Sequence, residues 1–385
     1  MEKFYYGVNR KNTNCIKWDS HSEEETNLLP FSIADSDYQT CQEVIDDLIE
    51  RVKEGTFGYT FVDEEYLEIV KNWFFRRHQY EIKKEWIVPC GGVVTALFIL
   101  VKTISETKDN VLVSTPVYNP FYSVIKNSGR NEVYNELIEV NNTYEIDFED
   151  LEEKLKQVKI YIFCNPHNPV GRCYSKDEVK RVVELCKKYN VTLISDEIHC
   201  DLAMLDSDFY SVGNFIDEYE NIVVCTAPSK TFNIAGLQNA NIIIKKEEYR
   251  EKFEKILSDY SISLPNVLSL TACKSAYLKG DNWVDLQRKY LTENRDIVYN
   301  FFDEHVKEAK VYKLEGTYLM WINLAFLNID QDELINGLKE KGVIVNSGMT
   351  YSPKYKGYIR LNIACPREQL LEGLKRIKEF ILECK

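Results

Sequence analysis

The middle of the chain alternates short, almost entirely apolar runs with longer stretches in which apolar residues recur at helical spacing. Short apolar runs bounded by polar residues are typical of buried strands, and spacing of three to four residues is typical of helices. The predicted strands are 110–114, 159–164, 191–195, 222–226 and 241–244. Strands that alternate with helices predict an α/β fold, with a mostly parallel central sheet flanked by helices.

Three helices are marked by clear start signals or by sustained helical spacing between these strands. Ser175–Tyr189 opens with Ser175-Lys176-Asp177-Glu178, a capping box in which the serine and the glutamate each accept an exposed backbone N–H. Asp147–Gln157 begins at a plausible N-cap, Asp147. Val93–Ser105 is the third predicted helix.

The C-terminal part has a different pattern from the middle. Trp283–Val306 predicts a long helix, which two shorter helices follow at Asp330–Lys341 and Pro366–Glu383. Strands are predicted at Leu319–Leu324 and Tyr358–Ile363. This mixture indicates a smaller α+β unit.

We therefore expect two domains. A large domain would span residues 46–280, and a small domain would combine residues 1–45 with 281–385. Thr40–Glu54 is the helix expected to connect them. A chain of 385 residues is long enough for two such cores.

Composition excludes several classes of partner. The net charge is −13, so we expect no nucleic-acid partner. The longest strongly apolar run, Val93–Val101, is too short to cross a membrane, and Met1–Phe4 starts no signal-peptide stretch. Eleven scattered cysteines without a Cys-x-x-Cys pair indicate a reducing compartment. The expected location is the cytoplasm.

Lys230 follows the apolar run Ile222–Cys225 and precedes small residues that suit a tight turn. A lysine at the end of a buried strand is costly to desolvate, which lowers its pKa. An unprotonated lysine is a nucleophile that forms Schiff bases. The position suggests a lysine that carries an aldehyde cofactor, of which pyridoxal 5′-phosphate is the example that can be tested against the rest of the sequence.

Ligands of open α/β sheets bind beyond the carboxyl ends of the strands, and that edge supplies the other groups pyridoxal phosphate needs. The pyridine nitrogen needs a carboxylate, for which Asp196 is the candidate, and the phenolic oxygen needs a donor, for which Asn168 is the candidate. The phosphate needs backbone amides, which the turn Gly91–Thr95 could supply. Tyr118 could provide the aromatic face for the ring, and Arg360 could bind the substrate carboxylate.

Each of these residues has an ordinary alternative role when it is considered alone. Asp196 suits a helix cap or a surface position, and Asn168 suits a Pro-rich turn. A glycine pair marks a turn, Tyr118 is one of 25 tyrosines, and Arg360 would also suit an internal ion pair. The functional interpretation depends on their combination.

In combination the residues resemble the fold-type I pyridoxal-phosphate enzymes of the class I/II aminotransferase superfamily. The shared order is a Gly-rich turn, an aromatic residue, Asn-Pro-x-Asn-Pro-x-Gly, Asp, Lys and Arg, over residues 30–365. The resemblance implies a cofactor site made of Lys230 (Schiff base), Asp196 (pyridine nitrogen), Asn168 (phenolic oxygen), Tyr118 (ring stacking), and the amides of Gly92 and Val93 (phosphate).

The resemblance also implies a homodimer with its active sites at the interface. Tyr59 resembles the tyrosine that reaches the phosphate in the neighbouring subunit. Arg360 would hold the α-carboxylate of an amino-acid substrate, with Asn168 and Ala34 beside it. Met349–Tyr358 and Ser32–Tyr38 are the loops expected to read the distal part of the substrate.

Three positions depart from the usual aminotransferase pattern. Ala227 replaces the Ser or Gly that lies three residues before the lysine. Gln238 replaces the phosphate-binding arginine, so the phosphate would depend more on amides and on hydroxyls such as that of Ser229. His199 replaces a tyrosine beside the cofactor.

Four segments resemble one branch of the superfamily, the cystathionine β-lyase-like C–S lyases. They are Lys17-Trp18-Asp19, Ala34-Asp35-Ser36-Asp37, the stretch Ser195–Leu202 and the stretch Pro228–Gln238. The resemblance implies cleavage of cystathionine or of cysteine S-conjugates to a thiol, pyruvate and ammonia. Lys230 would act as general base, with Lys230 or Tyr59 of the other subunit assisting proton transfer.

Two alternatives remain open from the sequence. An aminotransferase would use the same residues, and a regulatory protein could keep the fold and the cofactor without catalysis. His199-Cys200-Asp201 suggests metal ligands at first sight, but the spacing matches no zinc motif and adjacent strand residues point to opposite faces. We expect no metal site.

Overall fold

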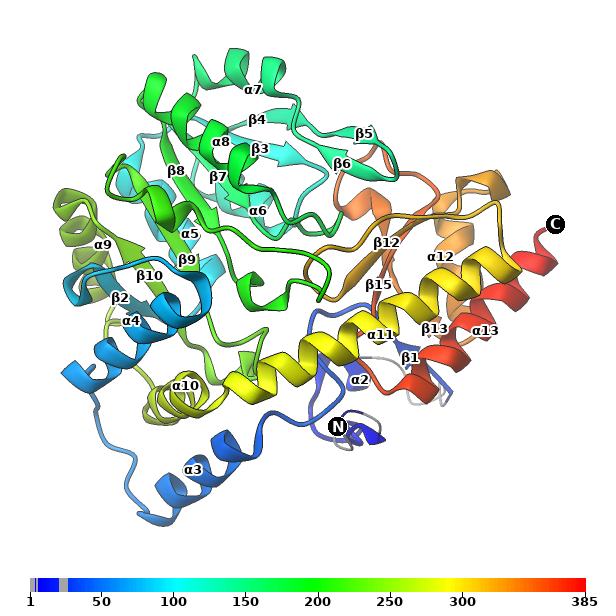
Figure 1. The fold of residues 1–385 in the computed structure, drawn as a ribbon, viewed down its shortest axis with the longest axis horizontal. Coiled ribbons are helices and arrows are strands. Elements are labelled where there is room, and N and C mark those ends of the chain that lie inside the picture. Colours follow the sequence, from blue (N-terminus) through cyan, green and yellow to red (C-terminus); the bar gives the residue numbers. More distant parts are fainter. Residues whose placement is uncertain (1–3, 5, 21–26) are drawn as a thin grey trace.

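A seven-stranded sheet forms the centre of the computed structural model, which describes residues 4, 6–20 and 27–385 (Figure 1). Its strands, from one edge to the other, are β2 (Ile87–Cys90), β10 (Ala240–Ile244), β9 (Ile222–Thr226), β8 (Thr192–Asp196), β7 (Ile160–Cys164), β3 (Asn110–Thr115) and β4 (Asn131–Glu136). β10 runs in the direction opposite to the other six strands of this sheet. The prediction of a mostly parallel sheet is confirmed.

Helices cover both faces of this sheet (Figure 1). On β7, Ile160 and Ile162 pack into one apolar layer while Tyr161 and Phe163 pack into the other. Because side chains alternate along a strand, a strand covered on both faces is apolar at every position. The first layer contains α5 (Val93–Ile104), α6 (Pro120–Asn127) and α9 (Glu247–Asp259), and the second contains α7 (Phe148–Leu155) and α8 (Lys176–Lys188).

The two helix starts that were predicted from capping residues coincide with the observed ones. Ser175 caps α8 by accepting the backbone N–H of Glu178, and the Glu178 carboxylate accepts the N–H of Ser175. Asp147 caps α7 by accepting the N–H groups of Glu149 and Asp150.

The two edge strands and a small hairpin are absent from the sequence-based prediction. β4 is the polar run Asn-Glu-Val-Tyr-Asn-Glu, and most of its side chains are at least partly exposed. β2 contains Pro89, which is tolerated at a sheet edge because one side of the strand has no hydrogen-bonding neighbour. β5 (Ile138–Val140) and β6 (Thr143–Glu145) form the hairpin. A search for short apolar runs finds strands that are buried on both faces, and it misses edge strands and hairpins with polar or proline residues.

A second, antiparallel sheet lies in the C-terminal part, beyond the long helix α11 (Asp281–His305) (Figure 1). Its order is β11 (Lys310–Val311), β12 (Leu319–Asn323), β15 (Tyr358–Asn362) and β14 (Asn346–Ser347). Helices α12 (Gln331–Glu340) and α13 (Arg367–Glu383) belong to the same part of the chain.

The N-terminal residues reach this C-terminal part. β1 (Leu29–Pro30) pairs in parallel with β13 (Val343–Ile344), and the short helix α2 (Ile16–Asp19) precedes it. We propose that 1–45 and 281–385 together form the small domain, and 46–280 the large one.

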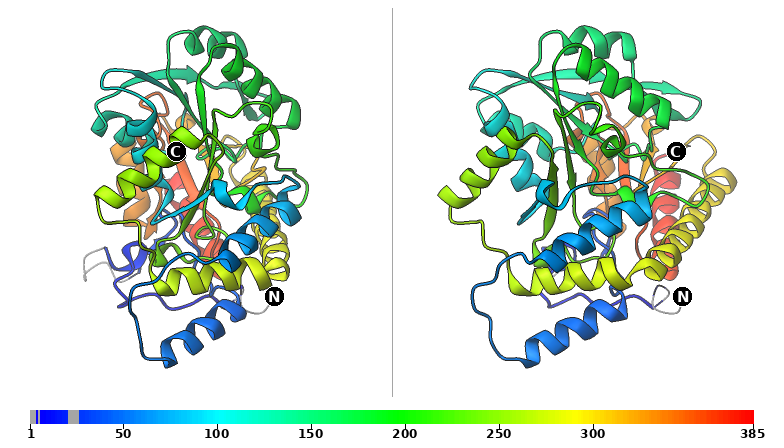
Figure 2. Two further views of the ribbon diagram at one scale, coloured as in Figure 1. Left: turned by 90° about the vertical axis from the view of Figure 1, so that its left-hand side faces the viewer. Right: turned by 60° about the vertical axis from the view of Figure 1, so that its left-hand side comes forward.

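Helix α3 (Gln42–Lys53) lies along α10 (Val267–Lys279) at the edge of the molecule, and an exposed segment leads from it to α4 (Glu64–His78) (Figures 1 and 2). Tyr59 in this segment is 97 % exposed, and Phe57 and Phe61 are exposed as well. Within the described residues, no helix has both the length and the apolarity required to span a bilayer.

Candidate active site

A cavity of about 210 Å³ opens where the carboxyl ends of β7, β8 and β9 meet the N-terminus of α5. Residues that are far apart in the sequence line it together. They are Ala34, Gly91–Thr95, Tyr118, Cys164, Asn168, Asp196, Ile198, His199, Ala227, Ser229, Lys230, Ala235, Gln238 and Asn239. This position agrees with the rule for ligands of open α/β sheets.

Lys230 follows β9 and projects into the cavity. Its Nζ donates a 2.7 Å hydrogen bond to the carbonyl oxygen of Ala34. Burial lowers the pKa of Lys230, with a further lowering from the Arg360 charge, while the carboxylates of Asp35 and Asp196 oppose this shift. A lowered pKa increases the unprotonated, nucleophilic fraction of the amine.

Asp196 is the last residue of β8 and is only 4 % exposed. Burial raises the pKa of its carboxyl to about 7, although the N–H of Ile198, 3.1 Å from Oδ1, and the charge of Lys230 act in the opposite direction. Because burial disfavours the ionised form of Asp196, a cationic group that enters the cavity would stabilise the carboxylate.

Arg360 lies in the middle of β15, buried, and stacks over the ring of Tyr351 with 5.0 Å between the guanidinium carbon and the ring centroid. Its hydrogen bonds go to neutral oxygens: Oδ1 of Asn168 at 3.0 Å, the carbonyl of Ser32 at 2.7 Å and Oδ1 of Asn346 at 2.9 Å. Its Nε is buried without a partner. Since these partners carry no charge, the guanidinium is suited to an incoming carboxylate.

The first turn of α5 lines another part of the cavity. Gly92 is the N-cap of this helix, and no atom lies within 4 Å of where a Cβ would stand on Gly91 or Gly92. The free N–H groups of a helix N-terminus bind anions. Ser229 and Thr95 also line the cavity and carry hydroxyl groups.

His199 lies in the cavity wall and is 4 % exposed. Burial, together with the charges of Lys230 and Arg360, lowers its pKa well below the usual value, so the imidazole is neutral. Its Nδ1 is buried without a hydrogen-bond partner, and its ring meets Tyr318 edge-on at 5.6 Å. Tyr118 also lines the cavity, and burial raises its pKa to about 12.

Most of the residues predicted for the site therefore come together, and two have distinct positions. Tyr59 does not line this cavity but lies by another depression, with Arg51 and Lys274. Arg360 does not line the cavity wall directly either, but it bonds Asn168, which does.

The sequence-based prediction missed several contacts that hold the site together. Tyr318 donates to the carbonyl of Ala34, 3.0 Å away, beside Lys230. Ser32 bonds Arg360 through its backbone carbonyl, which carries no sequence signal. A tyrosine in a chain with 25 of them gives no signal of its own.

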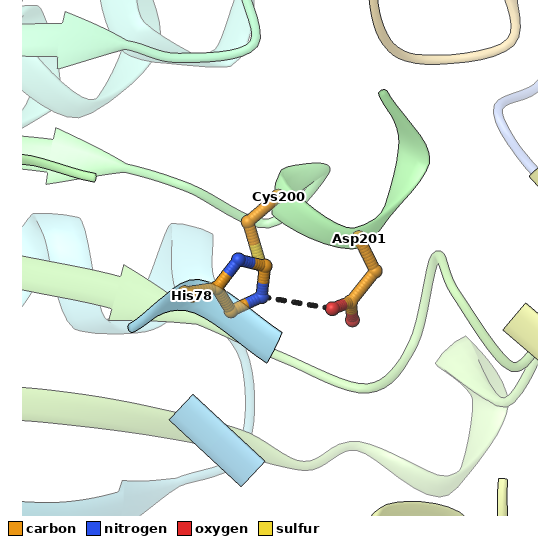
Figure 3. A group of neighbouring side chains, drawn as sticks. All are labelled: His78, Cys200 and Asp201. Carbon is orange, nitrogen blue, oxygen red and sulfur yellow. Dashed lines mark hydrogen bonds and ion pairs between the residues drawn. The ribbon is translucent and has the colours of Figure 1, made fainter. Parts of the chain in front are cut away.

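One group of potential metal ligands lies nearby within the described residues: His78, Cys200 and Asp201, with ligand atoms within 4.8 Å of one another (Figure 3). His199 is not part of it. Nε2 of His78 is 2.9 Å from Oδ1 of Asp201, and Oδ2 accepts from the hydroxyl of Thr231 at 2.9 Å. The carboxylate is thus fully engaged by protein groups, and the cluster ties α4 to the turn of Lys230.

The fold and cavity together define an α/β protein whose central sheet presents an amine of lowered pKa and a buried carboxylate at one edge. A guanidinium without a charged partner lies next to them, on β15 of the second sheet. The family model for aminotransferase class I and II matches residues 26–377. The chain belongs to this family, and the predicted membership is confirmed.

Relatives and solved structures match over almost the entire chain. The cystathionine beta-lyase PatB of Bacillus subtilis is 38 % identical, covering 96 % of this chain and 97 % of its own. Cystalysin from Treponema denticola, which contains pyridoxal 5′-phosphate, has a TM-score of 0.95 at 35 % identity, with 99 % of both chains covered. The pyridoxal-phosphate-bound C–S lyase of Staphylococcus hominis has a TM-score of 0.91 at 32 % identity, with 97 % of both covered.

The raised pKa of Asp196 predicts a pH-dependent stability effect in the ligand-free chain. A folded-state pKa of about 7, against 3.8 for the unfolded chain, favours the folded state at low pH, and this contribution is lost as the pH rises through 7. Asp196→Asn should therefore stabilise the protein more at pH 8 than at pH 5, by roughly 2–3 kcal/mol. Urea unfolding at both pH values measures it, and an equal effect at both would contradict the assignment.

Proposed function

We propose that this protein is a pyridoxal-phosphate-dependent carbon–sulfur β-lyase that cleaves cystathionine or cysteine S-conjugates. The observation that carries the proposal is the guanidinium of Arg360, which has no charged partner and bonds Asn168 in the wall of the cavity that Lys230 and Asp196 also line. The C–S lyases among the similar proteins support the choice of reaction.

The cavity suits the cofactor at each of its polar groups. Asp196 would face the pyridine nitrogen, where a cation relieves the cost of its burial. The amides of Gly92 and Val93 with the hydroxyl of Ser229 would hold the phosphate. Asn168 and Nδ1 of His199, which has no hydrogen-bond partner, would bond the phenolic oxygen, and Tyr118 would stack on the ring. When bound, the cofactor supplies an electron sink at the substrate's α-carbon.

The protein's own groups then divide the remaining work. Arg360 fixes the α-carboxylate, assisted by Asn168, with Ala34 beside the substrate. Lys230, once its amine is free, takes the proton from the α-carbon as general base, and its lowered pKa increases the unprotonated fraction available for this step. The thiolate at the β-carbon departs, and hydrolysis of the remainder yields pyruvate and ammonia.

The phosphate end of the cavity carries neutral side chains. Gln238 lies there, exposed, in the left-handed backbone region with φ of 56°. The lining residues near it, Thr95 and Asn239, are neutral too. Amides and hydroxyls would therefore hold most of the phosphate's charge.

We also propose a homodimer in which Tyr59 of one subunit completes the site of the other. A tyrosine that is 97 % exposed beside exposed Phe57 and Phe61 forms an apolar surface typical of an interface. A phenol hydroxyl delivered from the partner subunit would add a further neutral donor at the phosphate.

All eleven cysteines are free, which is in keeping with the expected cytoplasmic location.

The reaction type is tested by incubating the loaded protein with cystathionine in the absence of any keto acid. We expect pyruvate and thiol in equal amounts, because β-elimination needs no amino-group acceptor. Turnover that depends strictly on an added keto acid would instead indicate an aminotransferase. Retained cofactor without either turnover would indicate a binding protein.

Gln238→Arg should leave the dissociation constant of the cofactor unchanged or lower it up to about tenfold, because a guanidinium pairs with phosphate more strongly than an amide does. Fluorescence titration of the cofactor-free protein measures this constant. Gln79→Arg is the matched control, since Gln79 is also exposed with φ of 56° but lies at the end of α4. A clear rise in the constant would show that Gln238 has a specific role of its own.

The shared site predicts complementation between two inactive variants. Lys230→Ala and Tyr59→Ala dimers should each have little activity. Subunits that are mixed and allowed to exchange should regain about a quarter of wild-type activity, because half of the dimers are mixed and each has one intact site. No recovery, although mixed dimers are detected by native mass spectrometry, would place Tyr59 outside the partner's site.

A further inference from the structure

Five consecutive backbone carbonyls, those of residues 32–36, accept hydrogen bonds from side chains of other segments. We call residues 32–36 the strap. The pairs are Ser32 with Arg360 (2.7 Å), Ile33 with Asn362 (2.6 Å), Ala34 with Lys230 (2.7 Å) and Tyr318 (3.0 Å), Asp35 with Asn362 (2.8 Å) and Lys17 (3.2 Å), and Ser36 with Asn233 (2.9 Å) and Arg10 (3.0 Å). Such a run orders the backbone without any strand pairing of its own.

Two of these donors are the groups assigned to the cofactor and to the substrate carboxylate. Lys230 comes from the turn after β9, and Arg360 comes from β15 in the other sheet. The strap is bonded to both, so its position affects where each side chain lies. Formation of a covalent bond at Nζ of Lys230 removes hydrogens from that nitrogen, and the carbonyl of Ala34 then keeps Tyr318 as its donor.

A polar cluster holds the strap from the side of the N-terminal segment. Arg10 pairs with Asp35 through Nη2 and Oδ2 at 2.8 Å. Lys17, buried, pairs with Asp37 at 2.8 Å and lies 3.6 Å from Oδ1 of Asp35. The indole N–H of Trp18 donates to Asp37 at 2.8 Å. The motif Lys17-Trp18-Asp19 and the motif Ala34–Asp37 thus contact each other directly.

The strap also places charge near the reactive amine. The charges of Asp35 in the strap, Asp196 at the end of β8 and Arg360 in β15 shift the pKa of Lys230. The charge of Lys230 in turn lowers the pKa of His199, which follows β8. Among these charges, that of Asp35 has the largest effect on the pKa of Lys230, and it raises this pKa. Its carboxylate pairs in turn with Arg10, outside the cavity, and lies 3.6 Å from Nζ of Lys17.

We propose that the strap and its ion pair with Arg10 are a positioning element of the active site, which fixes the amine of Lys230 and sets the charge that this amine faces. Asp35 and Arg10 are positioning residues, because they act through Lys230 and touch neither the cofactor nor the substrate. The N-terminal segment is thereby part of the catalytic apparatus. This inference rests on the proposed role of Lys230.

The test is a pH titration of the visible absorbance of the cofactor-loaded protein. Asp35→Asn removes a negative charge near the cofactor-bearing nitrogen, so the pH midpoint should fall by about 0.5–1 unit. Arg10→Met removes the closer of the two cations beside Asp35 and should raise the midpoint by a similar amount. The double variant, which restores the charge balance, should lie close to wild type.

The control removes a comparable cation elsewhere. Arg295, buried in α11, pairs with Asp206 and Asp296, and Arg295→Met should lower the melting temperature without moving the midpoint. Opposite shifts in the two single variants, with cancellation in the double variant, would establish the inference. Unchanged midpoints, or shifts in one direction that accompany a lower melting temperature, would overturn it.

Failure of the proposed function gives a different result. If Lys230→Ala keeps the visible absorbance of the loaded protein through denaturation, the cofactor is attached elsewhere and the proposed function itself is wrong. If Lys230→Ala loses that absorbance while Asp35→Asn and Arg10→Met titrate as wild type does, only the role of the strap is refuted.

Discussion

The site depends on keeping a lysine amine in a cavity at the end of a central strand. Burial lowers the pKa of Lys230, and the surrounding protein must offer partners for both of its protonation states. The carbonyl of Ala34 accepts its hydrogen bond, while Asp35 and Asp196 favour its charge and Arg360 opposes it. The balance leaves an amine that can alternate between a nucleophile and a proton carrier.

This constraint explains why such distant segments meet. The turn of Lys230 is tied to the segment after Asp196 by Thr231, whose hydroxyl bonds Asp201, and through Asp201 to His78 on α4 (Figure 3). The strap joins the same turn to β15 of the second sheet. The strap is thus bonded both to the turn after β9 and to β15 of the second sheet, so the two parts of the molecule meet beside Lys230.

The sequence predicted the central strands because strands covered on both faces are apolar throughout, as β7 and β8 are. It predicted Asp196, Asn168 and Lys230 because they follow such strands, and all three line the cavity. It did not predict β4, whose exposed edge is polar. It placed Ser32–Tyr38 near the substrate but did not predict the hydrogen bonds of the strap, which go to backbone carbonyls that any residue provides. Partners of this kind become visible only when the fold brings them together.

The central claim is that Lys230 carries the cofactor, and its most direct measurement is reduction of the loaded protein with borohydride followed by peptide mass spectrometry. Reduction makes the lysine–cofactor bond permanent. The account predicts one stoichiometric pyridoxyl-phosphate adduct, on the peptide that contains Lys230. An adduct confined to any other lysine, or its absence from a protein that retains the yellow cofactor, would contradict the account.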